Sequence, residues 1–348
     1  MSKKRYGKSS SALLNQKTSF FEENKLHLNN QRRIAAIYAQ QPKRTNCKNC
    51  NYELDSTPDF TKDGIGYVIC NPCGHLNGVH EDTTEFCEAL YTADLGDEYV
   101  LNYHSDDVES YTYRTASIYV PKAEFLYTSL IDAKVNPHDL KFLDFGAGSG
   151  YFVDALKKLG LTNVVGTEVS TAQVDFANKM LGEGALQLHE MENSISILGE
   201  TKAQVVSMIG VLEHLQYPRE IMKALMENDN VQYVYISVPT FSFAVYLEIL
   251  SNEVFNRQLF GGHTHLYTKK SLDHLSNEFG FGVMAEWWFG TDVVDIFRHV
   301  AVTLERKNSS QKLQKLWREN FIPIIDAIQM EMDKESYSSE VHMILKKK

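Results

Sequence analysis

Short apolar runs alternate with amphipathic stretches through the middle of the chain. The apolar runs have the length of buried strands: 141–145, 163–167, 185–189, 204–211 and 231–239. Between them, stretches such as 151–159 and 170–181 repeat apolar residues at helical spacing. Strands that alternate with helices predict an α/β fold, in which a mostly parallel sheet is covered by helices on both faces.

The same patterns divide the chain into five segments. They are a flexible tail and helix at 1–41, a small cysteine-containing segment at 42–80, a connecting helical segment at 81–136, the α/β domain at 137–305 with an apolar insertion at 240–262, and a C-terminal helix within 306–348. Two further strands are expected at 281–289 and 296–304. The apolar insertion and the C-terminal helix are both candidate contacts with a second copy of the chain, so a homodimer is a further expectation.

Composition excludes several classes of protein. Of the 348 residues, 43% are hydrophobic, which is enough for a packed core and excludes global disorder. The formal net charge of −10 disfavours nucleic acid as a partner, although a local basic patch could override it. No apolar run reaches the roughly 18 residues of a membrane span. The basic, serine-rich start is not followed by an apolar signal region, which favours a cytoplasmic protein.

Four of the five cysteines form two Cys-x-x-Cys pairs, Cys47 with Cys50 and Cys70 with Cys73. In a cytosolic protein such pairs indicate a metal rather than disulfides. Four thiolates can surround one Zn²⁺ ion, and the strand expected at 64–69 would lead into the second pair as in a zinc ribbon. Four cysteines leave no position for a substrate, so we expect a structural zinc ion whose binding supports folding.

A glycine-rich turn follows the first strand of the α/β domain. Asp144 is followed by Gly146, Gly148 and Gly150, and a helix is expected to begin directly after them. Glycine permits positive φ angles and lets a ligand approach backbone amides at a helix N-terminus, so the turn predicts a nucleotide-like cofactor. The dinucleotide fingerprint needs another glycine at its sixth position, and neither frame of this turn supplies one. The spacing therefore argues against NAD.

The string from Asp144 to Gly150 resembles motif I of the class I S-adenosylmethionine-dependent methyltransferases, acidic-x-Gly-x-Gly-x-Gly. The resemblance implies a Rossmann-like, seven-stranded sheet and S-adenosylmethionine as cofactor, with Asp144 beside its methionine end. It also implies that Glu168 binds the ribose hydroxyls at the end of the second strand. Glu190 and Met191 are then expected to meet the adenine amine and ring.

Two later strings resemble the methyltransferase subgroup that includes ubiquinone-biosynthesis and sugar O-methyltransferases. Gly210-Val-Leu-Glu-His214 lies at the end of the fourth strand, where open α/β sheets bind ligands, so Gly210 is a candidate cofactor contact. Some relatives hold a divalent metal here, but Gly210 stands where a related pattern has a carboxylate, which leaves a catalytic metal open. The second string carries His263 and His265 after a double glycine. Histidine suits proton transfer near neutral pH, so His265, His263 and His214 are the candidate bases, in that order.

Together these features predict methyl transfer to an oxygen or nitrogen of a small polar acceptor. The subgroup resemblance implies a nucleotide-linked sugar or another carbohydrate precursor. The family resemblance also implies that a helix within 81–136 covers the cofactor and that the insertion 240–262 forms the acceptor pocket or a lid. Three alternatives stay open. The chain could be an RNA or DNA methyltransferase that grips its substrate with the zinc ribbon, which the net charge disfavours, or a non-catalytic cofactor-binding scaffold. The zinc could also take part in catalysis, which a closed set of four cysteines disfavours.

Overall fold

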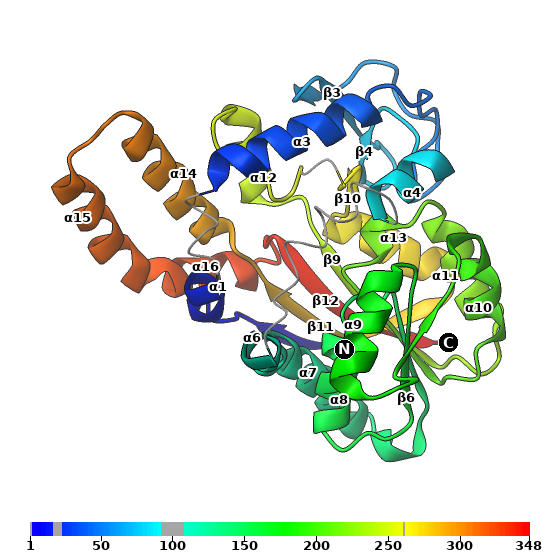
Figure 1. Cartoon of the computed structure of the whole chain (residues 1–348). Helices are drawn as coiled ribbons and strands as arrows, with labels where there is room; N and C mark the ends of the chain where they lie inside the picture. The colour runs from blue at the N-terminus through cyan, green and yellow to red at the C-terminus, as the bar shows by residue number, and fades with distance from the viewer. Residues whose placement is uncertain (1, 17–22, 92–107, 260–261) are drawn as a thin grey trace.

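An eight-stranded sheet runs through the part of the chain that the computed structural model describes, residues 2–16, 23–91, 108–259 and 262–348 (Figure 1). Its strands lie in the order β1-β11-β12-β9-β8-β5-β6-β7. Their bounds are β1 Lys3–Tyr6, β5 Phe142–Phe145, β6 Val164–Glu168, β7 Leu186–Leu188, β8 Val205–Ile209, β9 Tyr233–Pro239, β11 Phe281–Phe289 and β12 Glu340–Lys347. Strands β5 to β9 are parallel, which confirms the predicted α/β class.

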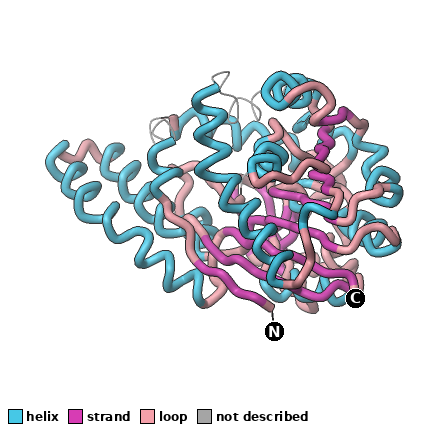
Figure 2. The backbone as a smooth tube through the Cα atoms, turned by 90° about the horizontal axis from the view of Figure 1, so that it is seen from below, coloured by secondary structure: helices cyan, strands magenta, loops and turns pink. Residues whose placement is uncertain are grey.

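Helices cover both faces of this sheet, and Figure 2 shows the strands running between them. The two sets are α7 (Val120–Asp132), α8 (Tyr151–Lys158) and α9 (Thr171–Leu181) on one face, and α10 (Ser194–Glu200), α11 (Pro218–Glu227) and α13 (Lys269–Glu278) on the other. Successive side chains of a strand point to opposite faces, so Phe142 packs in the first core cluster and Leu143 in the second. This two-sided burial explains why the central strands are almost uniformly apolar.

A small antiparallel sheet lies beyond the carboxyl ends of the parallel strands. Its order is β10-β4-β3-β2, with bounds β2 Phe60–Lys62, β3 Ile65–Ile69, β4 Leu76–Gly78 and β10 His265–Leu266. Strands β2, β3 and β4 belong to the cysteine-containing segment 42–80, which we call the ribbon. Helices α3 (Asn24–Tyr38) and α12 (Phe243–Leu250) pack against it through a shared core that includes Tyr38, Leu76 and Val245.

The start of the chain is not the flexible tail predicted for it. Lys3–Tyr6 form β1, which runs parallel to β11 at the edge of the large sheet. Backbone pairing continues to Gly7, whose N–H donates to the Trp288 carbonyl at 3.0 Å. The basic side chains stay at the surface, while Arg5 lies 3.9 Å from the centre of the Trp287 ring. An edge strand needs partners on one side only, so its sequence carries a weak strand signal.

The end of the chain also differs from the prediction. Residues 296–304, expected to be a strand, lie inside α14 (Asp292–Arg306), and the last strand of the sheet is β12, between β11 and β9. A short apolar run suits a strand or a buried helix equally, and here Val293, Phe297 and Val302 are buried residues of a helix. The segment 306–348 is thus more than one helix. It contains α15 (Gln311–Phe321), α16 (Ile325–Lys334) and β12.

Helices α14, α15 and α16 form an arm that extends from the body (Figure 1). The remaining helices are α1 (Ser11–Gln16), α4 (Thr84–Tyr91), α6 (Val108–Arg114) and a π-helical turn at Thr115–Tyr119. Residues 92–107 of the predicted connecting segment and 260–261 of the predicted insertion lie outside the described residues. Among the described helices, none combines the length and apolarity needed to cross a membrane.

Candidate functional site

A cavity of about 530 Å³ opens at the carboxyl ends of the parallel strands. Its lining comes from the turn after β5, the ends of β6, β8 and β9, and the start of β12. Helices α3 and α7, the π-helical turn, the residues after β7 and the loop that follows α12 also contribute to the lining. Ligands of open α/β sheets bind at this edge, so the fold itself marks the cavity as the candidate site.

The glycine turn forms one wall of the cavity. Gly146, Gly148 and Gly150 have φ angles of 69°, 54° and 77°, which side-chain-bearing residues rarely adopt. A Cβ atom on Gly146 would lie 2.7 Å from Cγ2 of Val211, which also lines the cavity. The backbone N–H groups of Gly146 and Ala147 both donate to the Thr167 carbonyl at 2.9 Å. The turn therefore has a fixed shape that only glycine at Gly146 permits.

Glu168 fixes the turn to the end of β6. One carboxylate oxygen accepts the Gly148 N–H at 2.9 Å, and the other accepts the N–H groups of Val169 at 2.8 Å and Ser170 at 3.1 Å. A carboxylate has about four lone-pair sites, so three backbone donors leave capacity for one more. Glu168 also lines the cavity. It can therefore organise the turn and bind a ligand hydroxyl together.

Asp144 lies at the end of β5, 2% exposed, and lines the same wall. Its Oδ1 accepts a hydrogen bond from the Ser207 hydroxyl at 2.6 Å. Burial raises the pKa of the Asp144 carboxyl to about 7, and the bond from Ser207 opposes this effect. A positively charged ligand group beside Asp144 would favour its ionised form.

His189 is a lining residue that the sequence reasoning missed. It follows β7 directly, and its ring lies 5.2 Å from the ring of Phe145. Within the described residues, neither ring nitrogen of His189 has a hydrogen-bond partner although both are buried. Met191 lines the cavity as well, whereas Glu190 is exposed and is not among the lining residues. The signal that could have found His189 is its place at a strand end.

Three further side chains of the lining gather in a second group. Glu213 and His214 follow β8, where Gly210 also lines the cavity, and His263 comes from the loop before β10. One ligand atom from each of the three lies within 4.8 Å of the others, and the two imidazole rings are 5.0 Å apart. Oε2 of Glu213 is buried without a hydrogen-bond partner in the described chain. We call these three residues the acidic-histidine cluster.

Burial controls protonation in the acidic-histidine cluster. It raises the pKa of the Glu213 carboxyl to about 8 and lowers the pKa of His214 to about 3 and of His263 to about 4. Both imidazoles are therefore neutral at pH 7. The His214 Nδ1 lies 3.2 Å from the Gly262 carbonyl and its Nε2 lies 3.9 Å from Glu213 Oε1. A proton gained by His214 would face the Glu213 carboxyl, which is itself protonated below about pH 8.

His265, ranked first among the candidate bases, does not line the cavity. Its side chain is 0% exposed, and its Nδ1 lies 2.8 Å from Nε2 of His75 in the ribbon. The reason is local: His265 lies in β10, which pairs with β4, whereas His263 lies in the preceding loop. The structure therefore brings together His263 and His214, and it places His265 behind them.

Residues 119–286 match the model of a protein family described as a methyltransferase domain. By this match the chain is a methyltransferase. The match covers just under half of the sequence, and it confirms the predicted enzyme class, a methyltransferase. The matched residues include the glycine turn and the acidic-histidine cluster but not the ribbon. A comparison with curated protein sequences finds no match.

Similar solved structures are also methyltransferases. The magnesium protoporphyrin IX methyltransferase (ChlM) from Synechocystis PCC 6803 with bound S-adenosylhomocysteine has 12% sequence identity and a TM-score of 0.46, covering 76% of this chain and 100% of that chain. The plantazolicin methyltransferase BpumL in complex with S-adenosylhomocysteine has 14% identity and a TM-score of 0.47, covering 75% of this chain and 94% of that chain. The assignment rests on the family match and the observed sheet.

The cavity also contains an ion pair that the sequence reasoning missed. Lys122 on α7 and Glu340 at the start of β12 both line the cavity, with Nζ and Oε1 3.2 Å apart. Behind them, His342 Nε2 lies 2.7 Å from the same Glu340 oxygen. The two charged residues are 218 positions apart in the chain. Only the fold brings them together, and no local sequence motif predicts either residue.

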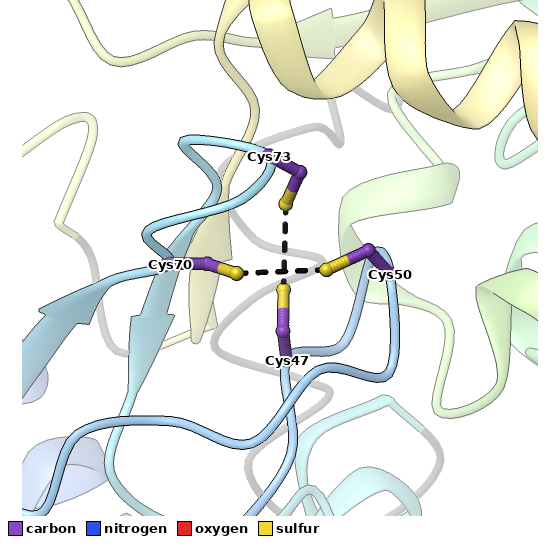
Figure 3. Close-up of side chains that lie close together, drawn as sticks. All are labelled: Cys47, Cys50, Cys70 and Cys73. Atoms are coloured by element: carbon purple, nitrogen blue, oxygen red, sulfur yellow. Dashed lines mark hydrogen bonds between the residues drawn. The ribbon is translucent and has the colours of Figure 1, made fainter.

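The four cysteines of the ribbon converge outside the cavity (Figure 3). The sulfur atoms of Cys47 and Cys73 are 3.7 Å apart, and those of Cys50 and Cys70 are 3.5 Å apart. A tetrahedral Zn²⁺ ion with bonds of about 2.3 Å separates its sulfur ligands by about 3.8 Å, so the arrangement fits four-thiolate coordination. Cys73 and Cys47 are buried, as a structural site requires.

Proposed function

We propose that this methyltransferase uses S-adenosylmethionine and transfers its methyl group to an oxygen or nitrogen of a small polar acceptor. The observation that carries the proposal is one cavity with two chemically different walls, one formed by the glycine turn and the other by the acidic-histidine cluster. The first wall suits a nucleoside-type donor, and the second suits the removal of a proton from an acceptor.

The donor wall offers contacts for each part of S-adenosylmethionine. Asp144 would face the ammonium group of the methionine end, and the remaining acceptor site of Glu168 would take a ribose hydroxyl. The unpartnered ring nitrogens of His189 and the side chain of Met191 supply a polar and an apolar contact for the base. Glu190 keeps a weaker claim to the adenine amine because it lies outside the lining.

The acceptor wall would remove the proton that a hydroxyl must lose. When bound, S-adenosylmethionine supplies an electrophilic methyl group on a positively charged sulfur. His214 and His263 are neutral at pH 7, as a general base must be, and Glu213 would stabilise an imidazolium at His214 in its ionised form, which it takes above about pH 8. One cavity that binds both reactants would hold them at reacting distance.

A second candidate for this wall is a divalent cation. Glu213, His214 and His263 present one carboxylate and two imidazole ligands within 4.8 Å, and one Glu213 oxygen has no hydrogen-bond partner in the described chain. A cation bound there would lower the pKa of Glu213 and polarise an acceptor hydroxyl. Added Mn²⁺ that binds the wild-type protein but not the Glu213→Gln variant would support this candidate, and equal binding to both would remove it.

For the acceptor, we propose a nucleotide-linked sugar or another carbohydrate precursor. This proposal rests on the resemblance of the strings around His214 and His265 to sugar-modifying relatives, and the charged pair of Lys122 and Glu340 adds a polar lining. The competing acceptor is RNA or DNA, which the net charge of −10 disfavours. Transfer of a radiolabelled methyl group to a panel of nucleotide sugars, with tRNA as the competitor, separates the two.

For the ribbon, we propose one structural Zn²⁺ ion held by Cys47, Cys50, Cys70 and Cys73. Metal analysis of the purified protein should find about one zinc per chain, lost in the Cys70→Ser variant. The Cys87→Ser variant is the matched control because Cys87 is a buried cysteine outside the cluster. Zinc retained after loss of Cys70 would contradict this assignment.

Calorimetric titration tests the donor directly. S-adenosylmethionine and S-adenosylhomocysteine should each bind the full chain at one site with a dissociation constant in the micromolar range. NAD⁺ is the control because the glycine spacing argues against it. Binding of NAD⁺ in place of S-adenosylmethionine, or of neither, would contradict the proposed function.

A further inference from the structure

The ribbon is joined by backbone pairing to the loop that carries His263. Strand β10 of the methyltransferase domain pairs antiparallel with β4 of the ribbon, with His265 opposite Asn77 and Leu266 opposite Leu76. The Gly78 N–H also donates to the Thr264 carbonyl at 2.8 Å. Thr264 is the residue after His263, so the paired segment begins directly beside the acidic-histidine cluster.

A buried histidine pair reinforces this junction. His75 follows the second cysteine pair, and its carbonyl accepts the Cys70 N–H at 2.8 Å. Its Nε2 lies 2.8 Å from Nδ1 of His265, and both side chains are 0% exposed. The other nitrogen of His75 lies 3.4 Å from the Ser271 hydroxyl at the start of α13. His75 therefore connects the second cysteine pair, through its backbone, to β10 and the first turn of α13, through its imidazole.

The first cysteine pair makes a parallel connection. Asn49, between Cys47 and Cys50, donates from its side chain to the Ser271 carbonyl at 3.0 Å. Its own carbonyl accepts a hydrogen bond from Arg219 of α11 at 2.8 Å. Helix α11 follows the segment that contains Glu213 and His214. Each element that supplies the acidic-histidine cluster is thus tied to a cysteine pair.

The donor wall has a different support. Its turn is held by Glu168 and by the Thr167 carbonyl, both on β6. Ribbon residues are absent from the cavity lining, and the turn's hydrogen bonds run to its own neighbours. A change in the ribbon can therefore reach the acceptor wall without passing through the donor wall.

We propose that the metal-loaded ribbon positions the acceptor wall, with His75 and Asn49 as the positioning residues that hold the segments bearing His263 and His214. The inference rests on the proposed function only in treating this wall as the acceptor side. It assigns a purpose to the zinc site beyond local folding: the four cysteines set the geometry of a wall they do not line.

Zinc removal from the full chain tests the proposal through hydrogen exchange. Treatment with a chelator should speed amide exchange at 262–268 and 210–216 by about tenfold, because the supporting hydrogen bonds are lost. Exchange at 142–150 and 164–170 should not change, and the affinity for S-adenosylhomocysteine should stay within about threefold. Unchanged exchange at 262–268 overturns the proposal. Equally faster exchange in both walls also overturns the proposal, because the ribbon would then stabilise the whole domain rather than the acceptor wall.

Point variants test the histidine pair with zinc in place. His75→Ala should speed exchange at 262–268 by about tenfold, and His75→Gln should restore it because the amide can reach His265. His274→Ala is the matched control, since His274 lies on the exposed side of α13. Equal effects of His75→Ala and His75→Gln would overturn the proposal.

Asn49→Ala supplies an independent arm of the test. It removes the side-chain bond to the Ser271 carbonyl and should speed exchange at 262–268, whereas a purely local role confines the change to the ribbon. These readouts need no acceptor. If the wild-type chain binds no S-adenosylhomocysteine, the proposed function fails, while exchange at 262–268 still decides this inference.

Discussion

The two walls of the cavity are built in different ways. The donor wall comes from neighbouring strands, with the turn at 145–150 held by backbone hydrogen bonds and by Glu168. The acceptor wall combines side chains from 213–214, 263 and 340 with Lys122, and distant ribbon residues support it. The first wall is a backbone structure and the second is a convergence of side chains.

This difference assigns different tasks to the walls. A backbone turn offers N–H groups at fixed positions, which suits a donor that the enzyme must bind in one orientation. Side chains from separate elements can be substituted one at a time without changing the backbone, which suits an acceptor that differs from one enzyme to another. We therefore expect substitutions in the donor wall to affect cofactor affinity and those in the acceptor wall to leave it intact.

The largest effect is expected from Gly146→Ala. The new Cβ would lie 2.7 Å from Val211 and the backbone would keep an unfavourable φ of 69°, so affinity for S-adenosylhomocysteine should fall by about 100-fold. Gly184→Ala is the control, since Gly184 has a φ of 79° with open space around it. Calorimetry measures both. Equal losses in the two variants would show that backbone strain, not the shape of the turn, matters.

Glu168→Gln should lower the affinity for S-adenosylhomocysteine by about 30-fold. The reason is that an amide cannot accept all three backbone donors and a ligand hydroxyl. Glu190→Gln is the matched control and should change affinity by less than about threefold, since Glu190 is exposed outside the lining. A larger loss in Glu190→Gln than in Glu168→Gln would reverse the roles given to the two acids.

Each wall contains one buried acid whose raised pKa makes stability depend on pH. The folded protein holds a proton on Asp144 up to about pH 7 and on Glu213 up to about pH 8, whereas the unfolded chain loses both near pH 4. Stability contributed by these groups therefore falls as pH rises from about 4 to 7 or 8. Asp144→Asn and Glu213→Gln should each remove part of this loss of stability at high pH.

Denaturant unfolding at pH 4 and pH 9 measures the effect. At pH 9 each variant should exceed the wild type in unfolding free energy by on the order of 2 kcal/mol, with little difference at pH 4. The gain should be larger for Glu213→Gln, because Asp144 has a hydrogen bond from Ser207 that favours its ionised form. If the variants exceeded the wild type in unfolding free energy at pH 4 but not at pH 9, both pKa shifts would be contradicted. Glu192→Gln, at an exposed acid, is the control.

The smallest effect is expected from the acceptor wall. His214→Asn and His263→Asn should leave the affinity for S-adenosylhomocysteine within about threefold of the wild type, because neither histidine belongs to the turn that binds the donor. Methyl transfer to any acceptor that the panel identifies should fall in both. A tenfold loss of donor affinity in either variant would show that the walls are not separable.

The donor wall was predictable because its signals are local. Asp144 and the three glycines specify a turn within a few residues, and the two cysteine pairs specify their own cluster. The histidines show where such reasoning stops. His263 and His265 are two residues apart, and only the pairing of β10 with β4 decides that His265 faces the ribbon. Lys122 on α7 and Glu340 on β12 meet only in the folded protein, so no local sequence pattern indicates the pair.

The crystal structure of the chain with S-adenosylhomocysteine tests the central claim most directly. We predict that the ligand lies across the turn from Gly146 to Gly150, with a ribose hydroxyl at Glu168 and its sulfur facing the acidic-histidine cluster. His263 and His214 should lie nearer to that sulfur than His265. A ligand bound away from the turn, or one whose sulfur faces away from the cluster, would contradict the account.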